Sequence, residues 1–237
     1  MLEELAPTFP ILPCILFLPV IGAVVLWLFD DEDMVRTSAL TVALMELALS
    51  VFVLLRFIPE SAAMQFSEHV PWIPALGVSY HLAVDGISVL FVGLTAFLAV
   101  LIIIYSWDTV RHQVKLYMMA LLALETTTMG VFLSIDLILF FVFWELMLIP
   151  SYFLIKLWGG GAERHYAALK FVLYPLLGSV FMLVGIALLD INYHQWAILR
   201  HMEPTYSFDC LLLLSVPIPF YHHVIIFWLL LLRFAFM

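Results

Sequence analysis

Residues 116–158 determine the fold, and they read LYMMALLALETTTMGVFLSIDLILFFVFWELMLIPSYFLIKLW. This stretch is apolar over about twice the length that one helix needs to cross a bilayer core about 30 Å thick. Only the short segment 134–136, Ser-Ile-Asp, interrupts it. The pattern therefore predicts two transmembrane helices, 116–134 and 137–158, joined as a hairpin by a tight turn.

Five further apolar segments outside this hairpin are long enough to cross the same core. They are residues 11–29, 37–58, 84–105, 168–189 and 220–237. Residues 59–83 and 190–219 are more polar and contain several prolines, which predicts extramembrane loops. The sequence thus predicts one all-α transmembrane domain over residues 1–237, a polytopic helix bundle of about seven spans.

The composition excludes an ordinary soluble domain. Hydrophobic residues make up 65% of the 237 positions and charged residues only 11%, against roughly 45–50% and about 25% in soluble domains. The net charge of −9 reflects in part the acidic run at 30–33, which is expected in a loop. The nine basic residues are scattered, so no nucleic-acid partner is expected. The lipid bilayer is the expected surrounding.

The basic residues predict the orientation, because lysine and arginine collect in cytoplasmic loops. One side holds Arg36, Arg111, Lys115, Lys156, Arg164 and Lys170, with Arg233 near it. The other side holds Arg56 and Arg200. The loop after the first span therefore lies in the cytoplasm, and the N-terminus is expected outside the cytoplasmic (inner) membrane.

Three acidic residues, Glu46, Glu125 and Glu145, fall well inside the expected spans, away from their ends. A charged side chain at the centre of a membrane helix costs about 2.5–3.5 kcal/mol, so such residues are candidates for function. From the turn at Asp136, Glu125 and Glu145 lie at depths of roughly 16 Å and 14 Å on neighbouring helices. The hairpin therefore places two carboxylates at matching depth near the middle of the membrane.

Helix 137–158 also carries a polar stripe, since Tyr152 and Lys156 return to the face of Glu145 at 3.6 residues per turn. Pro150 removes a backbone donor and frees a carbonyl about one turn earlier, next to Glu145. Such irregular backbone is tolerated at membrane depth where it lines a cavity. We therefore expect Glu145 to be a site of proton or charge relay, with Tyr152 on the route towards the cytoplasm.

Other charged residues have structural alternatives. Lys156 ends its helix and can extend its ammonium to the interface. Lys170 begins the next helix, where anchoring competes with an electrostatic role towards Glu145. Glu46 can bond a neighbouring helix instead of carrying protons, and Asp136 is expected to cap a helix start.

Soluble-enzyme motifs are absent from the sequence. His222 and His223 are adjacent and point in different directions on a helix. The sequence contains no His-x-x-x-His pair, no cysteine cluster and no glycine-rich phosphate loop, so neither a metal nor a nucleotide site is expected.

Several of these stretches resemble a known family. Residues 140–160, FFVFWELMLIPSYFLIKLWGG, resemble the fifth helix of subunit M, also called chain 4, of NADH-quinone oxidoreductase. LETTTMGVFLSIDLILF resembles the fourth helix of that family, HLAVDGISVLFVGLTAFL the entry to its third and ALKFVLYPLLGSVFMLVGI its sixth. The similarity is strong over 78–189 and returns from Ile225 to the end. The sister subunits and the Mrp-type antiporters look different around Glu145.

The resemblance implies half of an antiporter-like fold in a proton-translocating membrane-arm subunit, with other membrane-arm subunits as partners. Quinone reduction elsewhere in the complex would drive transport. The chain itself is then expected to perform no redox chemistry and to bind no cofactor; quinone, FMN and iron–sulfur clusters belong to other subunits. Glu145 and Glu125 match the acidic positions of the family's fifth and fourth helices, and Glu145 is expected to work opposite a lysine in a broken seventh helix.

The chain departs from this family at three places. It ends at Met237, where the family continues into a Val-Lys-x-Pro segment, so the partner lysine is expected beyond this residue. Pro175 replaces a residue that is usually hydroxylated, and Arg233 is an unexpected charge in an apolar stretch. Three interpretations stay open: a truncated form or fragment of the complex I subunit, a component of an Mrp-type cation/proton antiporter, and a non-functional remnant.

Overall fold

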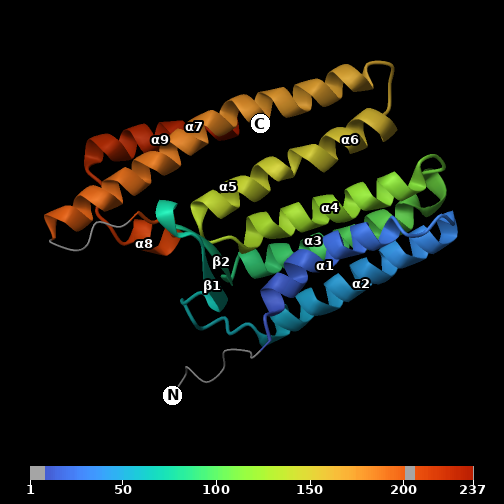
Figure 1. The fold of residues 1–237 in the computed structure, drawn as a ribbon, viewed down its shortest axis with the longest axis horizontal. Helices are drawn as coiled ribbons and strands as arrows, with labels where there is room; N and C mark the ends of the chain where they lie inside the picture. The colour runs from blue at the N-terminus through green and yellow to red at the C-terminus, as the bar shows by residue number, and fades with distance from the viewer. Residues whose placement is uncertain (1–8, 201–205, 237) are drawn as a thin grey trace.

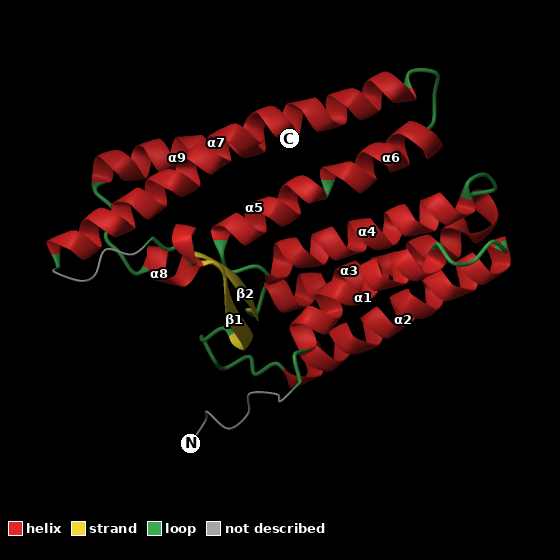
Figure 2. Cartoon of the chain, in the orientation of Figure 1, coloured by secondary structure: helices red, strands yellow, loops and turns green. Residues whose placement is uncertain are grey.

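The computed structural model describes residues 9–200 and 206–236, and its long helices lie side by side with nearly parallel axes (Figure 1). The first group of helices is α1 (Ile11–Leu26), α2 (Glu32–Arg56), α3 (Ser88–Thr109) and α4 (Val114–Leu133). The second group is α5 (Leu137–Leu146), α6 (Leu148–Trp158), α7 (Arg164–Leu199) and α9 (Phe220–Ala235). Helices dominate the described residues, as Figure 2 shows.

The first group shares an apolar core in two clusters. Leu16, Val92 and Met129 are buried in one cluster, and Ala39 and Met118 are buried in the other. Large apolar side chains also cover much of the outer surface. Five helices of the described chain are long and apolar enough to cross a membrane, and two shorter apolar helices, α1 and α9, accompany them. The fold is a polytopic transmembrane helix bundle.

Residues 59–83, expected as a loop without regular structure, contain an antiparallel hairpin instead. Strand β1 (Gln65–Ile73) pairs with β2 (Val78–Val84), and a 3-10 turn, η2 (Pro74–Leu76), joins them. Strand β2 includes the first residue of the span expected at 84–105, so that helix begins later, at Ser88. The apolar run His81-Leu82-Ala83-Val84 continues directly into the helix, so composition alone does not separate the two elements.

Two other boundaries differ from expectation because side chains and helix propensity extend the helices. Helix α2 begins at Glu32, since the Asp31 carboxylate accepts a hydrogen bond from Met34 N, and acids are favourable in a first turn. Helix α7 continues to Leu199, well beyond the expected end at 189. The expected loop 190–219 therefore holds the last turns of α7 and the short helix α8 (Cys210–Leu214), while residues 201–205 lie outside the described residues.

The span expected at 137–158 is divided at Met147 into α5 and α6. Pro150 has no N–H to donate one turn back, so the carbonyl of Leu146 loses its usual partner. The helical backbone nevertheless continues from α5 into α6, because Met147 N donates to Phe143 O at 3.1 Å. The irregular turn therefore begins directly after Glu145.

Candidate functional site

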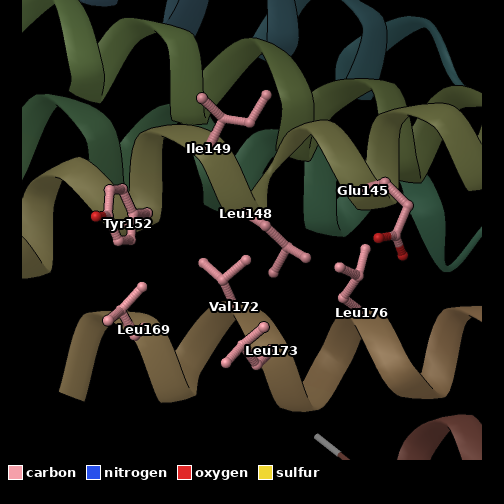
Figure 3. Close-up of a pocket in the computed structure, with 8 residues that line it drawn as sticks. All are labelled: Glu145, Leu148, Ile149, Tyr152, Leu169, Val172, Leu173 and Leu176. Atoms are coloured by element: carbon pink, nitrogen blue, oxygen red, sulfur yellow. The ribbon is translucent and has the colours of Figure 1, made fainter. Parts of the chain in front are cut away.

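Glu145 lies near the end of α5, beside a cavity of about 400 Å³ that is open at the surface of the bundle, where Ile149, Leu169 and Leu173 are exposed. Figure 3 shows this cavity between α5 and α6 on one side and α7 on the other. Its lining is Glu145, Leu148, Ile149, Tyr152, Leu169, Val172, Leu173 and Leu176. Glu145 and Tyr152 bring the only polar side chains among these, so the carboxylate faces an otherwise apolar space. The side chain of Glu145 is 19% exposed, which places it neither in bulk water nor fully among lipid chains.

Arg233 is the charged partner of Glu145. Its side chain is completely buried. Nη2 donates to Glu145 Oε1 at 3.4 Å, and Nη1 donates to the carbonyl oxygen of Pro175 at 2.8 Å. The guanidinium carbon also lies 5.4 Å from the ring centre of Trp144. A buried charge needs such partners, because desolvation without them costs several kcal/mol.

The position of Arg233 corrects an expectation. Its side chain was grouped near the cytoplasmic loops, but it contacts Pro175, about 16 Å along α7 from Arg164. The six remaining inner residues still outnumber the two outer ones, so the charge asymmetry that predicts the orientation is kept. A lysine opposite Glu145 was expected beyond Met237, and that stays a prediction; among the described residues, Arg233 is the cation that contacts Glu145.

The ion pair leaves part of Glu145 free. A distance of 3.4 Å is long for a charge-assisted hydrogen bond, which is usually about 2.7–2.9 Å. The second oxygen, Oε2, is buried and has no hydrogen bond of ordinary length within the described residues; the hydroxyl of Ser179 lies near the carboxyl group but donates to Leu176 O at 2.7 Å. The carboxylate is thus contacted by a cation at Oε1 and only loosely bonded at Oε2.

Glu46 and Glu125 form a second acidic site. They lie on α2 and α4, both are buried, and their carboxyl groups interact electrostatically with each other. All four carboxyl oxygens lack hydrogen-bond partners within the described part of the chain. The structure therefore brings Glu125 together with Glu46, whereas Glu145 pairs with Arg233. Ionising a buried carboxyl group that lacks donors is costly, and a second acidic group nearby adds to that cost.

The remaining candidates separate into two kinds. Tyr152 lines the cavity, and the Lys156 ammonium lies 5.1 Å from the centre of its ring, which continues the polar stripe from Glu145. Lys170 is exposed and lies 4.4 Å from the ring centre of Tyr166. Lys170 therefore contacts an interfacial aromatic residue at the helix start, the arrangement of an anchoring residue.

The bundle, its broken fifth span and its buried acids define a class: the antiporter-like membrane subunits. Residues 134–235 match the family described as NADH:quinone oxidoreductase/Mrp antiporter, transmembrane. Among solved structures, a chain of respiratory complex I from Thermus thermophilus with bound NADH superposes with a TM-score of 0.77 at 26% identity, over 94% of this chain and 43% of that one. A chain of the Mrp complex from Dietzia sp. shares the fold, with a TM-score of 0.74 at 20% identity over 95% of this chain and 23% of that one.

Curated relatives make the relationship more specific. NADH-quinone oxidoreductase subunit M of Rickettsia conorii is 35% identical over 95% of this chain and 45% of its own length. NAD(P)H-quinone oxidoreductase chain 4 2 of Thermosynechococcus vestitus is 42% identical over 75% of this chain and 33% of its own length. The chain spans less than half of the curated relatives it matches. The predicted resemblance to subunit M/chain 4 of NADH-quinone oxidoreductase is confirmed as sequence similarity over that part.

Proposed function

We propose that this chain forms part of a proton-translocating membrane-arm subunit of NADH-quinone oxidoreductase, with Glu145 as its central proton site. The single observation that carries the proposal is the pairing of Glu145 with the buried Arg233 beside a cavity. The chain matches relatives named as subunits of that enzyme.

The ion pair supplies a physical switch. An arginine stays protonated, so it keeps its charge wherever it lies. While its guanidinium is close, it stabilises the ionised carboxylate of Glu145; when the two move apart, the buried carboxylate is better stabilised by taking up a proton. Oε2 is the atom that accepts this proton, because Oε1 faces Arg233. The loose pair distance of 3.4 Å favours such a change.

The cavity beside Glu145 would supply the route along which protons move. Water in this space would connect Glu145 to the hydroxyl of Tyr152, and Lys156 follows towards the cytoplasmic end of α6. Glu125 and Glu46 would form a separate store that shares one proton between two carboxyl groups. Lys170 is assigned an anchoring role, because it is exposed beside Tyr166.

The same proposal also specifies the membrane and the partner subunits of the chain. The subunit would lie in the inner membrane with its N-terminus outside, in contact with other membrane-arm subunits. Quinone, FMN and iron–sulfur clusters would be bound by those other subunits, and this chain would contribute transport and no redox chemistry of its own.

An Mrp-type cation/proton antiporter component is the alternative that the shared fold supports. The two functions differ in what drives transport. Co-purification with quinone-reductase subunits and loss of transport with quinone-site inhibitors favour the complex I subunit. Transport that persists under those inhibitors favours the antiporter.

The decisive experiment is Glu145→Gln in membrane vesicles that contain the assembled complex. The amide keeps the shape of the side chain but does not exchange a proton, so the number of protons moved per electron is expected to fall. NADH oxidation and vesicle acidification are measured together, and native gels check that the complex still assembles.

Glu163→Gln is the matched control, because Glu163 is exposed before the start of α7. It is expected to leave the proton-to-electron ratio unchanged. If Glu145→Gln also leaves that ratio unchanged in fully assembled complex, Glu145 is not the proton site.

A further inference from the structure

Within the described residues, one group of side chains combines the ligand types and the closeness of a metal site: His69, His81 and Asp209. Their potential ligand atoms all lie within 4.8 Å of one another. The group lies at the end of the bundle that carries the β-hairpin and α8 (Figure 1). It takes no part in the proton path proposed above.

The hairpin register brings the two histidines together. His69 on β1 is directly opposite His81 on β2. Directly opposite residues of an antiparallel pair project from the same face of the sheet with Cβ atoms about 4.5–5.5 Å apart. The two imidazole rings accordingly meet edge to face, with centres 4.9 Å apart.

The third potential ligand, Asp209, is already oriented. Its Oδ1 accepts hydrogen bonds from Leu211 N at 2.9 Å and Leu212 N at 3.3 Å, which fixes the carboxylate at the start of α8. Its other oxygen, Oδ2, lies 2.5 Å from His81 Nδ1. One oxygen therefore holds the side chain in place, and the other is directed at the histidine.

Ser67 supports the ring of His81 from the far side, since Ser67 Oγ lies 2.9 Å from His81 Nε2. Without an ion, Nδ1–H donates to Asp209 and Nε2 accepts from this hydroxyl; when an ion displaces the Nδ1 proton, Nε2–H would donate to Ser67 Oγ and the Nδ1 lone pair would face the ion. Metal-binding histidines are commonly held in this way, with the second ring nitrogen bonded to an outer group that fixes the tautomer.

An ion can reach the group and has room beside it. His69 is exposed, although His81 and Asp209 are buried. His69 and Asp209 border a cavity of about 260 Å³, together with the polar groups of Ser79, Tyr193 and Ser207. This space is sufficient for a metal-bound water and opens on the extramembrane side of the chain.

We propose that His69, His81 Nδ1 and Asp209 Oδ2 bind a divalent transition-metal ion of the Zn²⁺ class, with water as the fourth ligand. Two imidazoles and one carboxylate are a ligand set that Zn²⁺ uses in proteins, whereas Mg²⁺ and Ca²⁺ require mainly oxygen ligands. Bond lengths of about 2.0–2.2 Å place tetrahedral ligand atoms about 3.3 Å apart. His81 and Asp209 must therefore separate slightly, while the exposed ring of His69 turns inwards.

A purely structural role explains only part of this arrangement. The contact between His81 and Asp209 attaches the hairpin to α8 without any ion. That role does not use His69, which contributes an exposed ring on the same face. His69 is therefore the residue that distinguishes a metal site from a hydrogen-bonded anchor.

The bound ion would connect two parts of the chain that are far apart in sequence. The hairpin links α2 to α3, and the segment with Asp209 links α7 to α9. The ion would restrain the outer end of α9, the helix that carries Arg233.

The test uses the full chain in detergent micelles, incubated with Zn²⁺ and then dialysed. The wild-type chain is expected to retain about one Zn²⁺ per chain, and His69→Ala is expected to weaken binding by at least about tenfold. Ser67→Ala is expected to weaken it by about 10–100-fold through the lost outer hydrogen bond. Metal content is measured by mass spectrometry, affinity by competition with a chelating dye, and folding by circular dichroism.

His165→Ala is the matched control, because His165 is an exposed histidine on α7, outside the cluster. It is expected to bind Zn²⁺ as the wild type does, and excess Mg²⁺ is expected not to displace the ion. Equal retention by His69→Ala and the wild type, or no retention by the wild type, would overturn the metal site. Neither result bears on Glu145.

Discussion

Two regions of the molecule differ in how their acidic residues are bonded. One is the polar network of Ser79, His81, Asp136 and Asp209 at one end of the bundle, and the other is the bundle interior with Glu46, Glu125 and Glu145. In the network, Asp136 accepts four hydrogen bonds, from Ser79 N, Ser79 Oγ, Ile138 N and Leu139 N. In the interior, Glu46 and Glu125 have no hydrogen-bond partner among the described residues, and Glu145 has a long contact with Arg233 and the Ser179 hydroxyl nearby. Fixed donors hold a carboxylate in one charge state, whereas a carboxylate without them is free to exchange a proton.

The network is continuous through the backbone as well. Ile135 N donates to His81 O at 2.9 Å, and Cys210 N donates to Ile135 O at 3.1 Å. The β-hairpin, the turn between α4 and α5, and the start of α8 are therefore joined at one end of the bundle. The buried acids Asp136 and Asp209 have several donors there, whereas the buried acids Glu46 and Glu125 on the long helices have none among the described residues.

The largest expected effect comes from removing the best-bonded carboxylate, in Asp136→Ala. The change deletes a helix cap and leaves two donors of the buried Ser79 without an acceptor, at a cost of about 3–5 kcal/mol. Thermal unfolding in detergent should show a clearly lowered Tm. Asp108→Ala, at an exposed position of α3, is the control and should not shift it. A matching Tm for both variants would mean that the network does not stabilise the fold.

A smaller effect is expected from Arg233→Met. The variant leaves Glu145 without its cation, and breaking a buried pair from one side costs up to several kcal/mol; the partial exposure of Glu145 reduces this to about 2–4 kcal/mol. The double variant Arg233→Met/Glu145→Gln should regain much of the loss, because no unpaired charge is left. Unfolding midpoints of the four proteins give the coupling energy. Additive losses would show that the pair is not coupled.

The smallest expected effect concerns Asp85, just before α3. Hydrogen bonds from the backbone N–H of Ser88 at 2.6 Å, and of Ile87 at 3.2 Å, lower the pKa of this carboxyl below its ordinary 3.8. A lowered folded-state pKa stabilises the fold above the unfolded-state value, and this stabilisation is lost as the pH falls through the folded-state pKa.

Asp85→Asn should therefore be less stable than the wild type near neutral pH, by about 1 kcal/mol or less. The difference should shrink between about pH 5 and about pH 3. The readout is the Tm of both proteins across that range. A difference that stays constant with pH would contradict an ionised, donor-stabilised Asp85.

Most of the membrane-spanning helices are predictable from the sequence, because a long apolar run is the main sequence signal of a transmembrane helix. The turn between α4 and α5 follows from Asp136, which caps the start of α5, and the irregular turn after Glu145 follows from Pro150. Both residues act on the backbone next to them. The β-hairpin is not predictable in this way, since the apolar end of β2 continues into α3 and its pairing with β1 is non-local.

The candidate sites also differ in whether their contacts are local in sequence, and therefore predictable, or non-local. Glu145 and Tyr152 are separated by about two turns, so the sequence predicts that they share a face, and both line the cavity. The Glu145–Arg233 pair joins residues 88 positions apart, and the His81–Asp209 contact joins residues 128 apart. No local spacing encodes these contacts, because they depend on how α9 and α8 pack.

Pro175 divides α7 into unequal arms. The arm from Arg164 to Pro175 is about 16 Å long, and the arm from Pro175 to Leu199 is about 36 Å. Proline removes a hydrogen bond at this point and makes it the natural position for bending. A tilt of about 5° there displaces the far tip by about 3 Å, over twice the displacement at the near tip. Because the Pro175 carbonyl also accepts from Arg233, the position at which α7 bends most easily lies against the buried guanidinium.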